Sequence, residues 1–333
     1  FPEKAIVILD SACIYTVNEL KEKAILPAMI DKTITQMTHI STTLTTKIKG
    51  QLNQIDKQLK TAIIGQDEAI TTITATLKRS FLSLGKRQKP LASFLFIGPT
   101  GVGKTVTAKI ISSCFFGQDR QLIRFDMSNY QNKQDISNLI GDLETATPGL
   151  LSQAIRNNPA AVLLLDEIEK ADKELLNIFL SLLDEGYYTD GFGKRVDGKN
   201  LIIIATSNAA SAAQFRQKQL EREELINYLV ENNYFSPEFL NRFDGLICFH
   251  KLTAEDFKKI IAQIILEISR EIEHNHQIKL IISPQYLDHL QANNLSEEFG
   301  ARNLNRIVRE TIGNRISDLI LKNQVKAGES ITL

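Results

Sequence analysis

Cysteine is scarce in this chain, and a net charge is absent. Only three cysteines occur among 333 residues, and 39 basic residues balance 39 acidic ones. Cys13, Cys114 and Cys248 stand far apart, without the spacing of a zinc site or a disulfide framework, which favours a reducing, cytoplasmic setting. The balanced charge argues against nucleic acid or a membrane surface as a partner.

Long apolar runs are missing as well. No stretch reaches the roughly 18 apolar residues that a membrane-spanning helix needs, and no signal-peptide pattern occurs. The chain begins at Phe1 and closes on the strand-like ESITL, so we interpret it as a fragment of a longer protein. With 43% hydrophobic residues over this length, it can bury cores for more than one domain.

Five short apolar runs follow one another between residues 94 and 249: FLFIG, LIRFD, AVLLLD, LIIIATS and GLICF. Runs without polar alternation are typical of strands covered on both faces, and helical segments such as residues 173–183 lie between them. We therefore predict an α/β fold, doubly wound around a five-stranded parallel sheet that binds its ligand at the carboxyl ends of the strands. After His250, an amphipathic helix capped by Thr253 predicts a smaller, mainly helical domain.

A glycine-rich motif interrupts the first of these apolar runs. It matches the phosphate-binding pattern G-x-x-x-x-G-K-[ST] between a predicted strand and a predicted helix, through Gly98, Pro99, Thr100, Gly101, Val102, Gly103, Lys104 and Thr105. Glycines let backbone N–H groups point at phosphates, Lys104 can reach the outer phosphates, and Thr105 can ligate Mg²⁺. The motif predicts a bound nucleoside triphosphate with Mg²⁺; a glycine-rich turn before a helix is the alternative.

Polar residues end two of the predicted strands. Asp166 could hold Mg²⁺, and Glu167 could orient and polarise the attacking water beside the phosphate loop. Asn208, after the next strand, could hold that water or the outer phosphate. Arg242 and Arg302 could each neutralise charge that develops on the γ-phosphate. Taken alone, an acidic helix start, a turn-forming asparagine and two solvated arginines explain the same residues.

These motifs, in this order and together with IIGQDEAI, FSPEFLNRFD and FGARNLNRIV, resemble the Clp class of AAA+ ATPases. The likeness is to the second ATPase module of the two-module unfoldases and disaggregases, and it covers nearly the whole chain. It implies that Ile64 and Gly65 belong to the adenine pocket and that Asn208 is sensor 1. It also implies that Arg242 is an arginine finger for the neighbouring subunit's nucleotide and that Arg302 is sensor 2.

The resemblance implies an AAA+ P-loop domain followed by a smaller, mainly helical α+β lid domain. Residues 1–17 would end the small domain of a preceding module, and residues 18–62 would form a helical linker. Residues 63–249 would be the large ATPase domain, and residues 250–333 the lid. The family further implies an ATPase with ATP and Mg²⁺ as cofactors, assembled as a homo-hexameric ring that remodels protein clients.

A departure from the family pattern concerns the loops that would line the ring's channel. Relatives grip the threaded chain there with an aromatic residue, but residues 141–159 contain none and are shorter than the family pattern. Leu143 and Leu150 are the bulky residues near the tip. A second channel loop keeps aromatic residues that could face the channel or simply pack: Tyr187, Tyr188 and Phe192.

A docking tripeptide for a barrel peptidase is also missing, because residues 209–237 contain no glycine. The leading prediction is an ATP-dependent protein-remodelling motor. The alternative is a nucleotide-switched scaffold, or a secretion-associated Clp ATPase faintly suggested by LDSAC, that hydrolyses ATP but threads poorly. The zero net charge disfavours a nucleic-acid motor or clamp loader.

Overall fold

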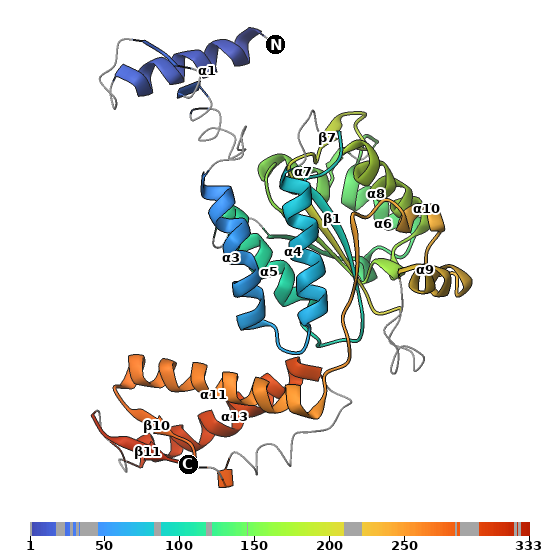
Figure 1. The fold of residues 1–333 in the computed structure, drawn as a ribbon. Helices are drawn as coiled ribbons and strands as arrows, with labels where there is room; N and C mark the ends of the chain where they lie inside the picture. Colours follow the sequence, from blue (N-terminus) through green and yellow to red (C-terminus); the bar gives the residue numbers. More distant parts are fainter. Residues whose placement is uncertain are drawn as a thin grey trace.

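The computed structural model describes most of the chain. The described residues are 2–17, 24–26, 29–30, 33, 46–82, 88–117, 122–144, 146–209, 222–283, 285–286, 300–322, 325 and 328–333. Figure 1 shows a central sheet flanked by helices, with the C-terminal helices α11 and α13 gathered below it. None of the described helices is long and apolar enough to cross a membrane.

The central sheet has five parallel strands. They are β1 (Ala92–Ile97), β2 (Leu122–Asp126), β5 (Val162–Asp166), β8 (Ile202–Ser207) and β9 (Gly245–Cys248), in the order β2-β5-β8-β1-β9. Each strand falls on one of the five apolar runs, so the predicted doubly wound sheet is confirmed. Asp126 pairs in register with Asp166, and Ile97 pairs with Ser207, which brings polar strand ends to one edge.

Alternating side chains of the strands enter two hydrophobic cores, one on each face of the sheet. Phe94 and Phe96 share one core with α3 (Thr46–Ala62), α4 (Asp67–Leu82) and α5 (Lys104–Phe116). Leu95 and Ile97 share the other with α6 (Lys133–Ile140), α7 (Leu150–Asn157), α8 (Lys173–Glu185), α9 (Arg222–Glu231) and α10 (Pro237–Leu240). Successive strand residues point to opposite faces, so burial on both sides explains the unbroken apolar runs.

The C-terminal part forms a smaller unit of helices and short strands. Helices α11 (Ala254–His276) and α13 (Gly300–Leu321) pack together, and β10 (Lys279–Ile281) pairs in parallel with β11 (Ser330–Thr332). Thr253 caps α11 reciprocally: its hydroxyl accepts from the Asp256 N–H at 3.2 Å, and the Asp256 carboxylate accepts from the Thr253 N–H at 2.9 Å. The predicted mainly helical α+β lid is therefore confirmed.

Shorter elements complete the described part of the chain. They are α1 (Pro2–Tyr15), the 3₁₀ turns η2 (Met127–Asn129) and η3 (Ile168–Lys170), and the hairpins β3 (Gly141–Asp142)–β4 (Thr147–Pro148) and β6 (Tyr187–Thr189)–β7 (Arg195–Asp197). The bounds of the four predicted segments stay predictions. Much of the predicted linker at 18–62 lies outside the described residues, as does 210–221 within the glycine-free stretch.

Candidate nucleotide-binding site

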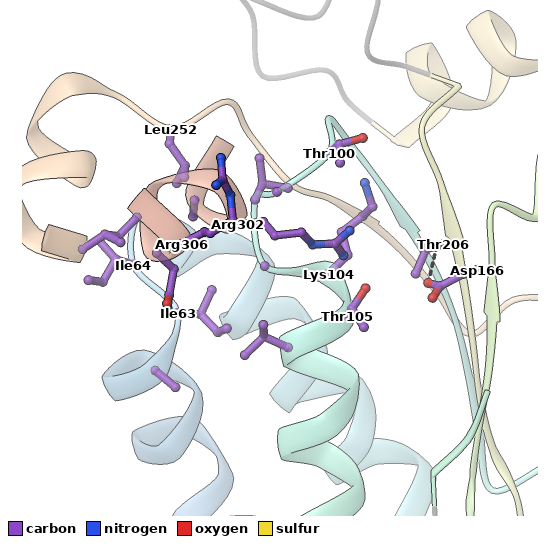
Figure 2. Close-up of a pocket in the computed structure, with 18 of the residues that line it drawn as sticks. Ile63, Ile64, Thr100, Lys104, Thr105, Asp166, Thr206, Leu252, Arg302 and Arg306 are labelled. Atoms are coloured by element: carbon purple, nitrogen blue, oxygen red, sulfur yellow. Dashed lines mark hydrogen bonds between the residues drawn. The ribbon is translucent and has the colours of Figure 1, made fainter. Parts of the chain in front are cut away.

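A cavity of about 660 Å³ opens between the carboxyl edge of the sheet and the lid. In Figure 2, Ile64 and Arg302 lie on one side, Asp166 and Thr206 lie on the other, and Lys104 lies between them. The predicted site residues that line it are Ile64, Thr100, Gly101, Val102, Gly103, Lys104, Thr105, Asp166, Glu167, Asn208 and Arg302. The others do not line it: Gly65, Gly98, Pro99 and Arg242.

The phosphate loop owes its shape to its glycines. It spans the turn between the end of β1 and the start of α5, as the motif requires. Gly98, Gly101 and Gly103 have φ angles of +153°, +82° and +109°, a region that residues with a Cβ rarely adopt. At Gly98 a Cβ would also lie 2.3 Å from the carbonyl oxygen of Phe249. A larger residue there would displace the loop from the sheet.

Lys104 is held inside the loop. Lys104 is only 7% exposed. Its ammonium donates three hydrogen bonds: to the carbonyl of Gly98, to that of Pro99 at 2.8 Å and to Asn208 Oδ1 at 2.8 Å. Burial lowers the pKa of Lys104 to about 8, although the nearby carboxylates, with that of Glu169 first among them, oppose the shift. Because its three partners are neutral, two backbone carbonyls and one side-chain amide, the ammonium can exchange them for charged phosphate oxygens.

A pH dependence follows from this buried lysine. Bound phosphates would return the pKa of Lys104 toward its ordinary 10.5, so binding takes up a proton once the pH exceeds about 8. We expect ATP affinity to fall by up to about tenfold per pH unit above that pH, measured by titration with a fluorescent ATP analogue. Lys104→Arg is the control, because a guanidinium stays protonated and should show no such fall. An affinity for the wild type that stays level into the alkaline range contradicts the prediction.

The end of β5 supplies two carboxylates in different surroundings. Asp166 is 6% exposed; its Oδ1 accepts from the Thr206 hydroxyl at 2.9 Å, and its Oδ2 pairs with Arg124 Nε at 2.6 Å. Glu167 is more open and has a φ of +56°, a strained angle for a residue with a side chain. Its N–H donates to Thr206 Oγ1 at 3.2 Å, and its carboxylate pairs with Lys170 at 2.6 Å. The strained turn aims Glu167 at the cavity.

Asn208 connects the lysine to the carboxylates. Its Oδ1 accepts from Lys104, and its Nδ2 lies 3.5 Å from Glu167 Oε1, at the outer limit for a hydrogen bond. Its backbone N–H donates to Glu169 Oε1 at 2.9 Å. The amide therefore stands between the cation for the outer phosphates and the candidate base, where a water molecule for attack would need to lie.

Sequence reasoning missed two residues of this group. Arg124 pairs with Asp166, and Glu169 holds the backbone of Asn208. The signal for Arg124 was a lone charge inside the apolar run LIRFD, on a strand whose register places it opposite Leu164, two residues before Asp166. No local pattern distinguished Glu169 from an ordinary acidic residue in the turn after β5.

The lid reaches the phosphate loop directly. The Ala301 N–H, at the start of α13, donates to the Gly101 carbonyl at 3.1 Å. The next residue, Arg302, lines the cavity and is among the charges that lower the pKa of Lys104. A cation supplied from the lid can therefore face the same phosphates as Lys104, and its position depends on how the lid sits over the sheet.

Arg242 is turned to a different surface. It follows α10, and its guanidinium lies 3.2 Å from Asp184 Oδ1 and 3.7 Å from Glu238 Oε1. Its Nε is buried, without a hydrogen-bond partner among the described residues. Within one chain, therefore, the structure does not bring Arg242 to the nucleotide cavity.

The cavity also offers hard oxygen ligands that fit Mg²⁺. The Thr105 hydroxyl and the Asp166 carboxylate both line it, and Mg²⁺ combines one or two such groups with phosphate oxygens. Within the described ranges no cluster of three His, Cys, Asp or Glu could hold a metal by itself. Thr105 and Asp166 would thus hold the ion together with the nucleotide, where it would neutralise phosphate charge.

The two predicted channel loops are joined to each other. Tyr188 is only 3% exposed, and its hydroxyl lies 2.9 Å from Ser152 Oγ on α7, so this aromatic packs rather than faces a channel. Arg156, also on α7, pairs at 2.7 Å with Asp190 of the second loop, whose side chain is buried. In the first loop, Leu143 and Leu150 are 67% and 53% exposed.

Comparison with known proteins decides the family. A family model described as the AAA domain (Cdc48 subfamily) matches residues 89–246, and one described as the C-terminal, D2-small domain of ClpB protein matches residues 252–333. The chain belongs to the Clp class of AAA+ ATPases. Only residues 247–251, at the crossing from the sheet to the lid, separate the two matches. The resemblance predicted from the motifs is confirmed.

Relatives of this Clp-class chain are longer proteins. Heat shock protein hsp98 of Neurospora crassa is 34% identical over 338 residues, covering 96% of this chain and 36% of that protein. Chaperone protein ClpB of Prochlorococcus marinus is 37% identical over 282 residues, covering 82% and 32%. A closed-state cryo-EM reconstruction of Hsp104 with ATPγS and FITC casein matches with a TM-score of 0.84 at 30% identity, covering 99% of this chain and 58% of that one. The chain spans about a third of the length of these two curated relatives.

Proposed function

We propose that this chain is the ATP-hydrolysing module of a ring-shaped protein-remodelling motor. The observation that carries the proposal is the convergence of Lys104, Asn208 and Glu167 on one cavity that the lid closes with Arg302. In the proposed reaction, Lys104 and Arg302 neutralise the outer phosphates, and Glu167 accepts a proton from the attacking water that Asn208 positions.

The proposed roles of the other predicted residues combine the resemblance with the lining of the cavity. The resemblance assigns Ile64 and Gly65 to the adenine, and Ile64 lines the cavity while Gly65 adjoins it in the chain. The loop from Gly98 to Thr105 would cradle the phosphates through its lining residues 100–105, and Thr105 with Asp166 would hold Mg²⁺. Arg242 would act on the nucleotide of the next subunit in a homo-hexamer, since it lies away from its own cavity. A head-to-tail contact of this kind closes into a ring when the rotation permits.

Protein clients are proposed from the relatives. Hsp98 and ClpB are named as a heat shock protein and a chaperone, and the Hsp104 reconstruction contains casein. Three free cysteines among the described residues suit a reducing compartment such as the cytoplasm. We do not propose a barrel peptidase as a partner, because residues 209–237 lack the glycine of the docking tripeptide. We do not propose a nucleic acid either, because the net charge is zero.

A second candidate is a module that hydrolyses ATP but threads poorly, as a nucleotide-switched scaffold or a secretion-associated Clp ATPase would. The observation that favours it is the character of the channel loops. Among the described residues of the first, the large apolar side chains that are exposed are the aliphatic Leu143 and Leu150, and Tyr188 of the second is buried. Aromatic rings offer large apolar contact at low entropic cost, and aliphatic side chains grip varied polypeptides less well.

One experiment tests both candidates. ATP turnover is measured with and without an unfolded protein, for wild type and for Lys104→Ala. We expect the substitution to abolish nucleotide binding, because it removes the cation that faces the outer phosphates. Strong stimulation by unfolded protein supports the motor, and steady turnover without stimulation supports the second candidate. Unchanged affinity of Lys104→Ala for an ATP analogue would contradict the site assignment itself.

A further inference from the structure

A buried glutamine side chain holds the backbone of the segment that leads from the sheet to the lid. It runs from Phe249 to Thr253, between the end of β9 and the start of α11, and Figure 1 shows it descending beside α4. Gln66, immediately before α4, is 1% exposed and makes both of its side-chain hydrogen bonds to the backbone of His250, 184 residues away. We call this arrangement, formed by Gln66 and His250, the hinge clamp.

The hinge clamp satisfies both backbone groups of one residue. Gln66 Nε2 donates to the His250 carbonyl at 2.8 Å, and Gln66 Oε1 accepts from the His250 N–H at 2.9 Å. Both lengths are typical of hydrogen bonds. The planar amide makes the same pair of hydrogen bonds that a residue on a neighbouring antiparallel strand would make. Only an amide of this length supplies a donor and an acceptor side by side. Without Gln66, two part-buried backbone groups would lose their partner.

The crossing segment and the first turn of α11 also contact residues that adjoin the nucleotide cavity. The Phe249 N–H donates to the Ile97 carbonyl at 2.7 Å, and the Phe249 carbonyl lies where a Cβ on Gly98 would be. The Asp256 carboxylate presses on Gly65, whose Cβ, if present, would lie 2.6 Å from the carboxyl carbon. The phosphate loop, the residues before α4 and the crossing segment thus form one packed unit.

Both sides of the hinge clamp adjoin the cavity. Ile64, two residues before Gln66, and Leu252, two residues after His250, both line it. We propose that Gln66 is the residue that positions the lid over the nucleotide. Its two bonds fix the direction in which the crossing segment leaves the sheet, and thereby where Arg302 stands relative to Lys104. This positioning role deepens the proposed function and rests on the proposed nucleotide site.

Two substitutions separate the hydrogen bonds from the packing. Gln66→Leu keeps the volume and removes both bonds, whereas Gln66→Glu keeps the acceptor and replaces the donor with an oxygen that repels the His250 carbonyl. In the full chain, hydrogen–deuterium exchange of the peptide that contains His250 reports the hinge clamp without any nucleotide. ATP turnover of each variant, measured with and without the additional Arg302→Ala substitution, reports whether the lid places Arg302 at the nucleotide. Gln54→Leu, at an exposed position on α3, is the matched control.

We expect Gln66→Leu to speed exchange at the His250 amide by about tenfold or more and to lower turnover about tenfold. Adding Arg302→Ala should lower turnover little further, because Arg302 would already be misplaced; independent residues would show multiplied effects. Gln66→Glu should speed exchange less than Gln66→Leu does, because a carboxylate oxygen still accepts from the His250 N–H. If the leucine variant does not fold, the result for Gln66→Glu decides the test.

Unchanged exchange in a folded Gln66 variant, or effects of Gln66→Leu and Arg302→Ala that multiply, would overturn the proposal. Failure of the proposed function has a different signature. In that case wild type would not bind an ATP analogue, while exchange at the His250 amide would still report whether Gln66 holds the crossing segment.

Discussion

Glu167→Gln should leave ATP binding intact and reduce turnover by about 10²–10⁴-fold, the range that a lost general base costs. The amide keeps the size and hydrogen-bonding reach of the carboxylate but cannot accept the proton of the attacking water. Glu167 lines the cavity, and its carboxylate lies beside the Asn208 amide, whereas the phosphate-facing cation is Lys104, which the substitution leaves in place. Binding and hydrolysis should therefore separate in this variant.

The measurement pairs steady-state turnover with titration of a fluorescent ATP analogue. Glu174→Gln is the matched control, because Glu174 lies on the neighbouring helix α8, exposed and paired with Lys133. It should behave as wild type in both assays. A Glu167→Gln variant that turns over ATP at the wild-type rate would show that another group accepts the proton, and Glu169, whose carboxylate accepts from the Asn208 N–H, would then be the next carboxylate to test.

The sequence predicted the sheet and the phosphate loop because both depend on local patterns. Five unbroken apolar runs became five strands buried on both faces, and the loop needed only its own glycines and the strand and helix beside it. The cap at Thr253 could be predicted for the same reason, because its partner Asp256 lies only three residues further along the chain. In each case the interacting groups are close together in the chain.

Contacts between distant segments could not be read in this way. Gln66 bonds to His250 across 184 residues, and Arg124 pairs with Asp166 across 42, and neither pairing leaves a periodic or spaced signature. Tyr188 illustrates the same limit. From the sequence it could face a channel or pack, and only the folded position of Ser152 on α7 shows that it packs. Tertiary partners decide such roles, and local patterns do not contain them.

An effect at least as large as loss of the base should come from Arg242→Ala. Arginines that stabilise charge on a transferring phosphoryl group contribute about 10³–10⁵-fold to turnover, and we expect a loss approaching that range. The substitution should not disturb ATP affinity, because Arg242 does not line the cavity of its own chain and is held by Asp184 and Glu238 instead. Arg315→Ala, at an exposed position on the lid helix α13, is the control and should have no effect.

Mixing subunits distinguishes a finger that acts on the next chain from a residue that merely packs. An Arg242→Ala subunit keeps an intact cavity but lacks the finger, whereas a Lys104→Ala subunit lacks a working cavity but keeps the finger. Where a Lys104→Ala subunit stands beside an Arg242→Ala subunit in a ring, its Arg242 can complete the intact cavity of that neighbour. Mixed rings should therefore regain turnover that neither variant shows alone. Mixing is verified by a size or fluorescence-transfer measurement. Verified mixed rings without regained turnover would mean that Arg242 acts within its own chain, through the contacts with Asp184 and Glu238 that support α10.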